Sequence, residues 1–243
     1  MSLICISDVH LGYQHSRREE FARFLGELAE KKEVEGLVVV GDLLDMWRRD
    51  MAGVVLENAD ILGQMARLSF PVYYVAGNHD YHVRLLRNFH YPFFFSSQLN
   101  LTQAGVTCRF LHGYEFDPTL LQGYFEALCY TSDELGEMGS QAYSLFTRLW
   151  QRWPPWPGAK RRRQEMKQML RPPQERIAGL VQGIEERARA QVGPGEVLVF
   201  GHTHRPFAQG NLANCGSWVA DSFPSSTYIE ITSGQPNLHT FPP

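Results

Sequence analysis

The sequence predicts an α/β fold, a sandwich built around mixed sheets. In the first half of the chain, short apolar runs rich in β-branched residues alternate with segments of helical periodicity. Toward the end, from 211 to 241, short segments with the period-2 pattern of strands follow one another. With 243 residues, 44% of them hydrophobic, the chain can bury one sizeable core. We therefore expect a single domain over 1–243.

The expected elements begin with a strand over 3–6 and a helix in which apolar residues at 21, 24, 25 and 28 recur at helical spacing. Ser16 and Glu19 fit a capping box at the start of this helix. A second helix is expected over about 52–68, and Thr227–Ile231 alternates as a strand does. The remaining expected strands are Gly36–Val40, Pro71–Val75, Val106–Leu111 and Glu196–Phe200.

Composition excludes several classes of protein. A net charge of -3 together with 44% hydrophobic residues excludes a disordered chain. The apolar runs are far shorter than the roughly 18 residues of a membrane span, and residues 1–6 lack the basic start and cleavage site of a secretory signal. We therefore expect a cytoplasmic protein. Its four cysteines have no Cys-x-x-Cys spacing and are expected to be reduced, mostly buried thiols: Cys5, Cys108, Cys129 and Cys215.

Polar clusters containing Asp, Asn or His follow five of the expected strands. In open α/β sheets ligands bind at the carboxyl ends of strands, so we expect these clusters to converge on one crevice. Carboxylate, imidazole and amide donors without thiolate suit Mn²⁺ first, with Fe²⁺ or Zn²⁺ as alternatives. The candidate ligands are Asp8, His10, Asp42, Asn78, His112, His202 and His204.

Seven donors are too many for one ion but fit two, provided that a carboxylate such as Asp42 bridges them. Two ions about 3.5–4 Å apart clamp the attacking and leaving oxygens of a phosphoryl displacement. Any single histidine is more often a hydrogen-bonded structural residue than a ligand. Five clusters in one chain, each beside a glycine, nevertheless favour a metal site.

The clusters also carry a family resemblance. Their order resembles the motif set of the calcineurin-like metallophosphoesterases: Asp8-Val9-His10, Gly41-Asp42, Gly77-Asn78-His79-Asp80, His112-Gly113 and Gly201-His202-Thr203-His204. The resemblance spans 1–113 and 196–232 and implies a four-layer αββα sandwich of two mixed sheets. It implies one ion on Asp8, His10, Asp42 and His204, and another on Asp42, Asn78, His112 and His202. It also implies that His79 is an acid beside the metals and that Asp80 orients it.

The expected reaction is hydrolysis of a phosphoester or pyrophosphate bond by a metal-bound hydroxide, with His79 protonating the leaving group. An alternative is that His79 only forms a hydrogen bond within its loop. Asp45, three residues beyond Asp42, either supports the metal site or caps a helix.

More than eighty residues between 113 and 196 are not required by the motif set. Apolar residues at helical spacing between 120 and 149 predict a helical lid, as an insertion over 115–192. Trp150, Trp153 and Trp156 precede the basic run Lys160–Arg163. This combination indicates either a membrane-interface anchor or anionic-amphiphile site, or a solvated basic helix whose aromatic neighbours pack on the core.

A closer resemblance is to the UDP-2,3-diacylglucosamine pyrophosphatase branch, carried by Gly41–Trp47, Gly201–Pro206 and Asn214–Trp218. That branch usually has arginine at the position of His79. The resemblance implies a small or lipid-linked phosphate substrate. Peripheral membrane contact through the lid is expected if the tryptophans beside the basic run form an interface anchor.

Two other functions compete with this one. A metal-dependent nuclease or nucleotide phosphodiesterase has the same motifs, but a pI of about 6.3 makes nucleic acid an unexpected partner. A non-catalytic scaffold would have no reason to keep all seven donors. The sequence does not indicate an oligomeric state.

Overall fold

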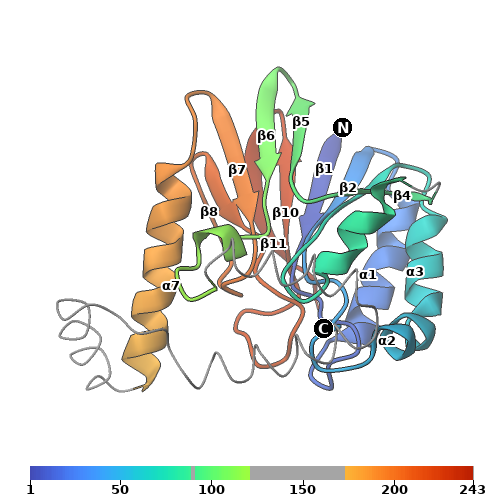
Figure 1. Ribbon diagram of the computed structural model, residues 1–243. Helices are drawn as coiled ribbons and strands as arrows, with labels where there is room; N and C mark the ends of the chain where they lie inside the picture. The colour runs from blue at the N-terminus through green and yellow to red at the C-terminus, as the bar shows by residue number, and fades with distance from the viewer. Residues whose placement is uncertain (89–90, 121–172, 243) are drawn as a thin grey trace. The chain divides into compact units, whose positions relative to one another are not determined.

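The structure is a computed structural model that describes residues 1–88, 91–120 and 173–242 (Figure 1). The chain divides into two compact units. The larger one comprises Met1–Glu115 and Ala188–Pro243, and the smaller one comprises Phe116–Arg187. The predicted organisation, a single domain with a lid over 115–192, stays a prediction.

The larger unit contains two mixed sheets. The first has the order β11-β10-β1-β2-β3-β4, in which β1 to β4 run parallel and β10 is antiparallel to β1. Its strands are β1 (Ser2–Ile6), β2 (Val34–Val40), β3 (Val72–Val75), β4 (Phe93–Ser96), β10 (Thr227–Thr232) and β11 (Gln235–Thr240).

The second sheet has the order β5-β6-β7-β9-β8, with β6, β7 and β9 parallel and the two edge strands antiparallel to their neighbours. Its strands are β5 (Leu99–Gln103), β6 (Val106–Phe110), β7 (Glu196–Phe200), β8 (Phe207–Gln209) and β9 (Leu212–Asn214). The predicted α/β sandwich of two mixed sheets is confirmed.

The main core lies between the two sheets. Leu3 and Cys5 of β1 are packed there with residues such as Phe110 and Val199 of the second sheet. Ile4 is also fully buried, and it faces the opposite side because successive residues of a strand point to opposite faces. The central strand β1 is therefore covered on both faces.

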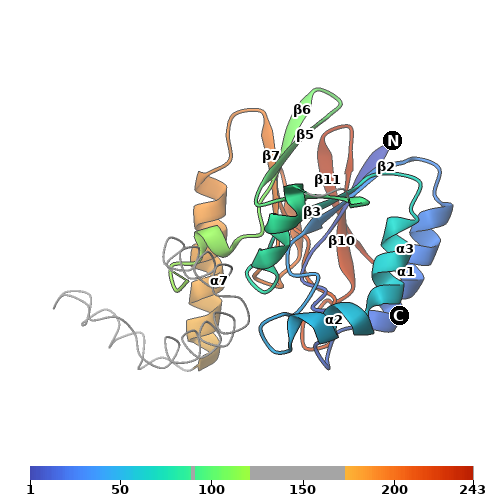
Figure 2. The ribbon, with the colours of Figure 1, turned by 45° about the vertical axis from the view of Figure 1, so that its right-hand side comes forward.

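Helices cover the outer face of the first sheet. The helix α1 (Arg18–Glu30) buries Phe21, Phe24, Leu25 and Leu28, as the periodicity predicted. The ring centroid of Phe24 lies 5.1 Å from that of Tyr228 in β10. In Figure 2, α1 and α3 (Ala59–Ala66) stand beside this sheet.

Two local predictions are wrong. The helix α1 has Arg17 as its N-cap with no side-chain hydrogen bond, and the hydroxyl of Ser16 donates to the carbonyl of Val9 instead of capping the helix. The helix expected over 52–68 is two helices, α2 (Met51–Glu57) and α3, separated by Asn58. The buried amide of Asn58 donates to the carbonyl of Val54, a local hydrogen bond that competes with a continuous helix.

Of the smaller unit, the structure describes 116–120 and most of the helix α7 (Pro173–Ala190), in which Arg187 donates to the carbonyl of Phe116. The predicted lid helices between 121 and 149 lie outside the described residues, as do the three tryptophans and the basic run that follows them. None of the described helices combines the length and the apolar character that a membrane crossing requires.

Cys5, Cys108 and Cys215 are buried free thiols, as expected, whereas Cys129 lies outside the described residues.

Candidate metal centre

All the candidate ligands lie on loops that directly follow strands. In Figure 1, β6 and β7 point toward the side on which these loops gather. Both sheets present the carboxyl ends of their parallel strands there, so residues distant in sequence come together. Asp8 and His10 follow β1, Asp42 follows β2, Asn78 follows β3, His112 follows β6, and His202 and His204 follow β7.

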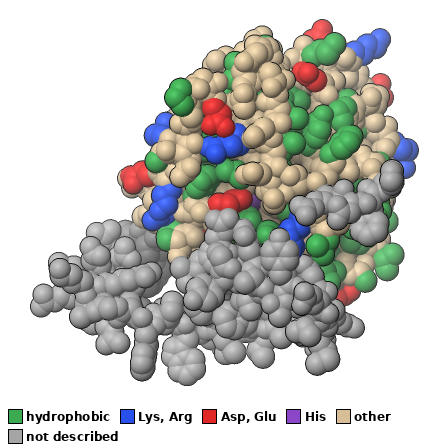
Figure 3. Space-filling view, turned by 45° about the horizontal axis from the view of Figure 1, so that its top comes forward, with side chains coloured by type: hydrophobic (Ala, Val, Ile, Leu, Met, Phe, Trp, Pro, Cys, Tyr) green, Lys and Arg blue, Asp and Glu red, His purple; other side chains and the backbone are tan. Residues whose placement is uncertain are grey.

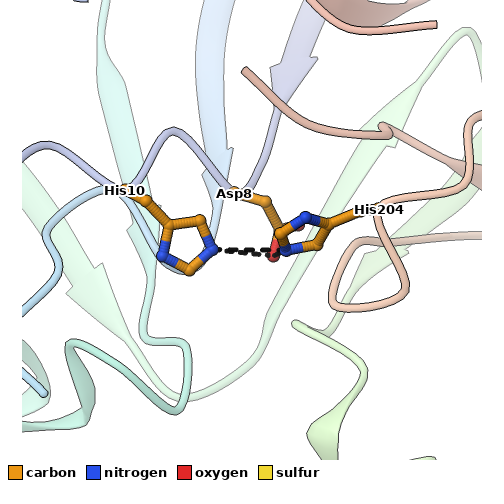
Figure 4. Close-up of side chains that lie close together, drawn as sticks. All are labelled: Asp8, His10 and His204. Atoms are coloured by element: carbon orange, nitrogen blue, oxygen red, sulfur yellow. Dashed lines mark hydrogen bonds and ion pairs between the residues drawn. The ribbon is translucent and has the colours of Figure 1, made fainter. Parts of the chain in front are cut away.

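The first group of donors consists of Asp8, His10 and His204. Figure 4 shows the two imidazoles approaching the carboxylate of Asp8. Oδ1 of Asp8 lies 3.2 Å from Nε2 of His204, and the two Nε2 atoms lie 3.3 Å apart. Three donor atoms at this spacing form a site that could hold one ion.

The second group consists of Asp8, Asp42 and His112. Oδ2 of Asp42 lies 3.2 Å from Nε2 of His112 and 3.8 Å from Nε2 of His10. Asp42 thus has a ligand of each proposed ion close to the same carboxylate oxygen. This is the position that a bridging carboxylate requires.

Several donor atoms of the site are buried without a hydrogen-bond partner among the described residues. They are Oδ1 of Asn78, together with Oδ1 of Asp8 and Nε2 of His112, which face only other donor atoms of the site. A buried polar atom without a partner costs about 1–3 kcal/mol. Metal coordination would remove this cost, so the donor set fits divalent ions.

Other atoms of the same side chains hold them in place. Nδ1 of His112 donates to the carbonyl of Val40 at 2.8 Å, which directs Nε2 toward Asp42. Oδ2 of Asp8 accepts from the backbone N–H of His202 at 2.9 Å, and Oδ1 of Asp42 accepts from that of His79 at 2.8 Å. Such contacts orient metal ligands and tune their basicity.

The charges of the site favour cations. Burial by itself would lower the pKa of His10 and His112, but the surrounding carboxylates outweigh burial and raise the pKa of each imidazole to about 10. In turn, His204 and His112 overcome the effect of burial on Asp8 and hold the pKa of its carboxyl well below its usual value. In the metal-free protein, protons on these histidines therefore supply the positive charge that divalent ions would supply when bound.

Backbone strain is concentrated at the site. Left-handed backbone is uncommon for residues other than glycine and costs on the order of 1–3 kcal/mol each. Five candidate ligands adopt positive φ: Asp8 (53°), His10 (51°), Asp42 (55°), His202 (65°) and His204 (56°).

Steric contacts explain why glycine occupies positions beside the clusters. Gly41 has φ of 82°, and a Cβ on it would collide with the imidazole of His112. A Cβ on Gly201 would collide with the carboxylate of Asp8. These positions therefore accept no larger residue without displacing a candidate ligand.

His79 forms a third group of donors with His10 and Asp42, and Asp45 holds its imidazole. Its Nδ1 is 3.0 Å from Oδ1 of Asp45, which is completely buried. Oδ2 of Asp45 lies 3.5 Å from Nδ1 of His10, and the ring of Trp47 stacks on His79 with centroids 4.4 Å apart. Of the two roles considered for Asp45, the structure shows contact with the metal-site residues.

The orienting role implied for Asp80 stays a prediction, and the hydrogen bonds of its side chain point to a different role. Its buried carboxylate accepts from the backbone N–H groups of Leu43 at 2.8 Å and Gly77 at 2.7 Å, and from the hydroxyl of Tyr74 at 2.5 Å. The contact with the His79 imidazole is made by Asp45 instead. Asp80 therefore cross-links the loops after β2 and β3.

Asn214 is a supporting residue to which the sequence assigned no role. Its buried side chain donates to the carbonyl of Gly201 at 2.7 Å and accepts from the N–H of Gly216 at 2.8 Å. It thereby fixes the loop that carries His202 and His204. Only its place in the run Asn214–Trp218, noted for its family resemblance, singled it out.

Comparison with known proteins agrees with this geometry. The family model described as calcineurin-like phosphoesterase matches residues 1–206, which makes the protein a metal-dependent phosphohydrolase. The chain belongs to the calcineurin-like phosphoesterase family, and this family implies a dimetal centre.

Individual relatives are distant. The chain is 26% identical over 257 residues to the UDP-2,3-diacylglucosamine hydrolase of Aromatoleum aromaticum, covering 97% of this chain and 95% of the relative. It resembles the solved structure of a dimetal phosphatase from Danio rerio at 11% identity and a TM-score of 0.47, covering 100% and 99% of the two chains. It also resembles the structure of Vps29 complexed with zinc from Entamoeba histolytica, at 13% identity and a TM-score of 0.41, covering 98% of this chain and 97% of that one.

Proposed function

We propose that this protein is a dimetal phosphoesterase that cleaves the pyrophosphate bond of a UDP-linked acylated sugar. The observation that carries the phosphoesterase part is the shared position of Asp42, with buried donor atoms of Asp8 and His112 left for an ion. The substrate is supported by the relative from Aromatoleum aromaticum, whose name gives UDP-2,3-diacylglucosamine as what it hydrolyses.

Both ions are proposed to be Mn²⁺, because the donors are carboxylate, imidazole and amide. Asp8, His10, Asp42 and His204 would hold one ion, and Asp42, Asn78, His112 and His202 the other. When bound, such a pair supplies water activation near neutral pH and neutralises charge on the phosphoryl group.

His79 is the proposed proton donor to the leaving oxygen. The Nδ1–H group of His79 donates a hydrogen bond to the carboxylate of Asp45. The proton that is transferred to the leaving oxygen is therefore the one on Nε2. Burial lowers the pKa of His79, and the nearby Asp42 opposes this effect only in part. A protonated imidazole with a lowered pKa is the stronger acid. The stacked ring of Trp47 shields one face of His79 from water.

The test compares hydrolysis of UDP-2,3-diacylglucosamine by protein reloaded with Mn²⁺ after chelation. Asp42→Ala is expected to lower kcat by about 10³-fold or more, because metal-ion catalysis contributes several kcal/mol. Glu35→Gln removes an exposed carboxylate on β2 and serves as the matched control that keeps full activity. A metal-loaded wild type that is inactive on this substrate and on activated phosphoesters would contradict the proposal. Faster cleavage of DNA than of the UDP compound would favour the nuclease instead.

A further inference from the structure

A cavity of about 630 Å³ in the larger unit is not used by the proposed chemistry. It is lined by the loop after His10, by the start of α1 and by residues between β2 and α3, including Tyr13, Arg18, Arg49 and Glu57. Its volume is well above that of a single phosphate and lies within the range of about 300–1,000 Å³ typical of ligand pockets.

The cavity borders the metal centre through Arg48, which also lines it. The guanidinium of Arg48 forms an ion pair with Asp45, the residue that holds His79. It also lies 4.4 Å over the ring of Tyr13, so a flat cation–aromatic pair forms one wall. The cavity therefore adjoins Asp45, the residue that faces Nδ1 of His79.

The lining contains three arginines and one acidic residue, Glu57. Each arginine pairs with one carboxylate, that of Asp45, Asp60 or Glu57, so an anion would be bound by the N–H donors that these pairs leave over. Arg18 contacts both carboxylate oxygens of Asp60 at 2.6 Å, and Arg49 pairs with Glu57. A guanidinium has five N–H donors and a single carboxylate occupies at most two in the usual fork, so donors remain for a ligand. The side chains of Arg18 and Arg49 are 39% and 40% exposed and thus accessible.

We propose that this cavity binds a second oxyanion of the substrate, a phosphate or a carboxylate outside the scissile group. The identity of that group as part of a substrate rests on the proposed phosphoesterase function. A substrate with only the scissile phosphate would form no hydrogen bond with the remaining N–H donors of these arginines. A pyrophosphate-linked or otherwise doubly anionic substrate places its second charge against them, and the remaining volume accepts the sugar or nucleoside attached to it.

Glu57 competes with the ligand for Arg49, and this makes the proposal testable in both directions. Replacing Arg49 should weaken anion binding, whereas replacing Glu57 by a neutral residue should strengthen it. Neither residue belongs to the metal centre. Arg67 provides the control, because it is exposed beyond the end of α3 and does not line the cavity.

The first experiment measures binding of inorganic pyrophosphate to metal-free protein by calorimetry, so that it does not depend on activity. Arg49→Glu should raise the Kd at least about ten-fold, the loss expected for a charge-assisted contact, and Arg49→Gln should show the same direction. Glu57→Gln should lower the Kd, and Arg67→Glu should leave it unchanged. Thermal denaturation establishes that each variant is folded. Equal Kd values for wild type, Arg49→Glu and Arg49→Gln would overturn the proposal.

The same titration with malonate separates the two sources of the oxyanion. Binding of pyrophosphate alone identifies a phosphate site, and binding of malonate alone identifies a carboxylate site. Whichever compound binds must bind more weakly to Arg49→Glu for the proposal to stand, and binding of neither compound overturns it. In kinetics with Mn²⁺, Arg49→Glu should raise the KM for UDP-glucose about ten-fold and leave that for p-nitrophenyl phosphate unchanged. If wild type hydrolyses neither these compounds nor UDP-2,3-diacylglucosamine, the proposed function fails, while the binding result still decides the cavity.

Discussion

Asp45 links three groups that differ in their roles. Its two oxygens face His79 and His10, and Arg48 of the arginine-lined cavity pairs with the same carboxylate. The two imidazoles hold the pKa of Asp45 far below its usual value, although burial alone would raise it. The carboxylate is therefore charged at neutral pH and fixes the orientation of His79.

The first prediction concerns this charge. Asp45→Asn keeps the shape of the side chain but removes the charge, and we expect kcat to fall about 10²-fold on an alkyl phosphate, within the usual range for general acid catalysis. The loss should be much smaller on p-nitrophenyl phosphate, whose leaving group needs no proton. The measurement is the ratio of the two rates.

His79→Gln should reproduce this ratio, and the double variant should lose little more than either single one, because the two residues act as a unit. Asp221→Asn removes an exposed carboxylate from a loop near His204 and provides the matched control. A loss of equal size on both substrates would contradict the acid role of His79.

The contrast between Asp80 and Asp45 shows which site residues can be located from sequence alone. Every proposed ligand was identified from its strand-end motif, and five of the seven share the donor groups of the structure. The partner of His79 was assigned to its neighbour Asp80, but the two side chains leave the bend after β3 in different directions, and Asp80 contacts Leu43, Gly77 and Tyr74 instead. The actual partner lies 34 residues earlier and arrives through the pairing of β2 with β3.

Among the elements, strands with strong apolar runs were predicted well and edge strands were not. The strand β7 matches its predicted bounds, whereas β4 and β5 were missed. In the structure β5 and β6 form a hairpin whose turn, Ala104 and Gly105, has φ of 51° and 81°. The glycine in this turn was the sign of a hairpin that the sequence contained. The helix pair α2 and α3 was merged because the interruption at Asn58 depends on one side-chain hydrogen bond.

The second prediction concerns the link between strand ends. Asp80→Asn replaces one carboxylate acceptor by a donor, so the N–H groups of Leu43 and Gly77 and the hydroxyl of Tyr74 compete for fewer lone pairs. Burial and the nearby Asp42 raise the pKa of Asp80 to about 6, so removing the charge offsets part of the loss. We expect the free energy of unfolding to fall by about 1–2 kcal/mol, because buried donors lose charge-assisted partners. Urea denaturation of the metal-free variant measures it.

This experiment also separates Asp80 from Asp45. The alkyl to p-nitrophenyl rate ratio of Asp80→Asn should equal that of wild type once metal is restored. Asp50→Asn, at the exposed N-cap of α2, is the control and should change stability by less than about 1 kcal/mol. A normal free energy of unfolding with an altered rate ratio would return the orienting role to Asp80.

At the scale of the whole molecule, the net charge of -3 conceals a local excess of negative charge in the metal centre. On the face that Figure 3 shows, positive and negative side chains of the described residues are interspersed. Within the metal centre, by contrast, the buried carboxylates of Asp8, Asp42 and Asp45 lie around the histidines. The cytoplasmic location and peripheral membrane contact stay predictions.

The last prediction follows from this charge. The pKa of His10 and of His112 is about 10 in the folded metal-free protein, against the usual value of 6.5 in the unfolded chain. These histidines contribute stability that is complete below pH 6.5 and is lost as the pH rises toward 10, because the unfolded chain releases its protons first. The Tm of metal-free protein should therefore fall steadily between pH 6.5 and 8.5.

Protein loaded with Mn²⁺ should show a much flatter Tm over this range, because the imidazoles then bind metal rather than protons. Metal binding to the free protein should accordingly release protons and tighten as the pH rises, which calorimetry in buffers of different ionisation enthalpy measures. His112→Gln should remove about half of the slope of the metal-free protein, since one of two protonated histidines is gone. His239→Gln, an exposed histidine on β11, should leave the slope as it is. Equal slopes with and without metal would show that protons and metal do not share these ligands.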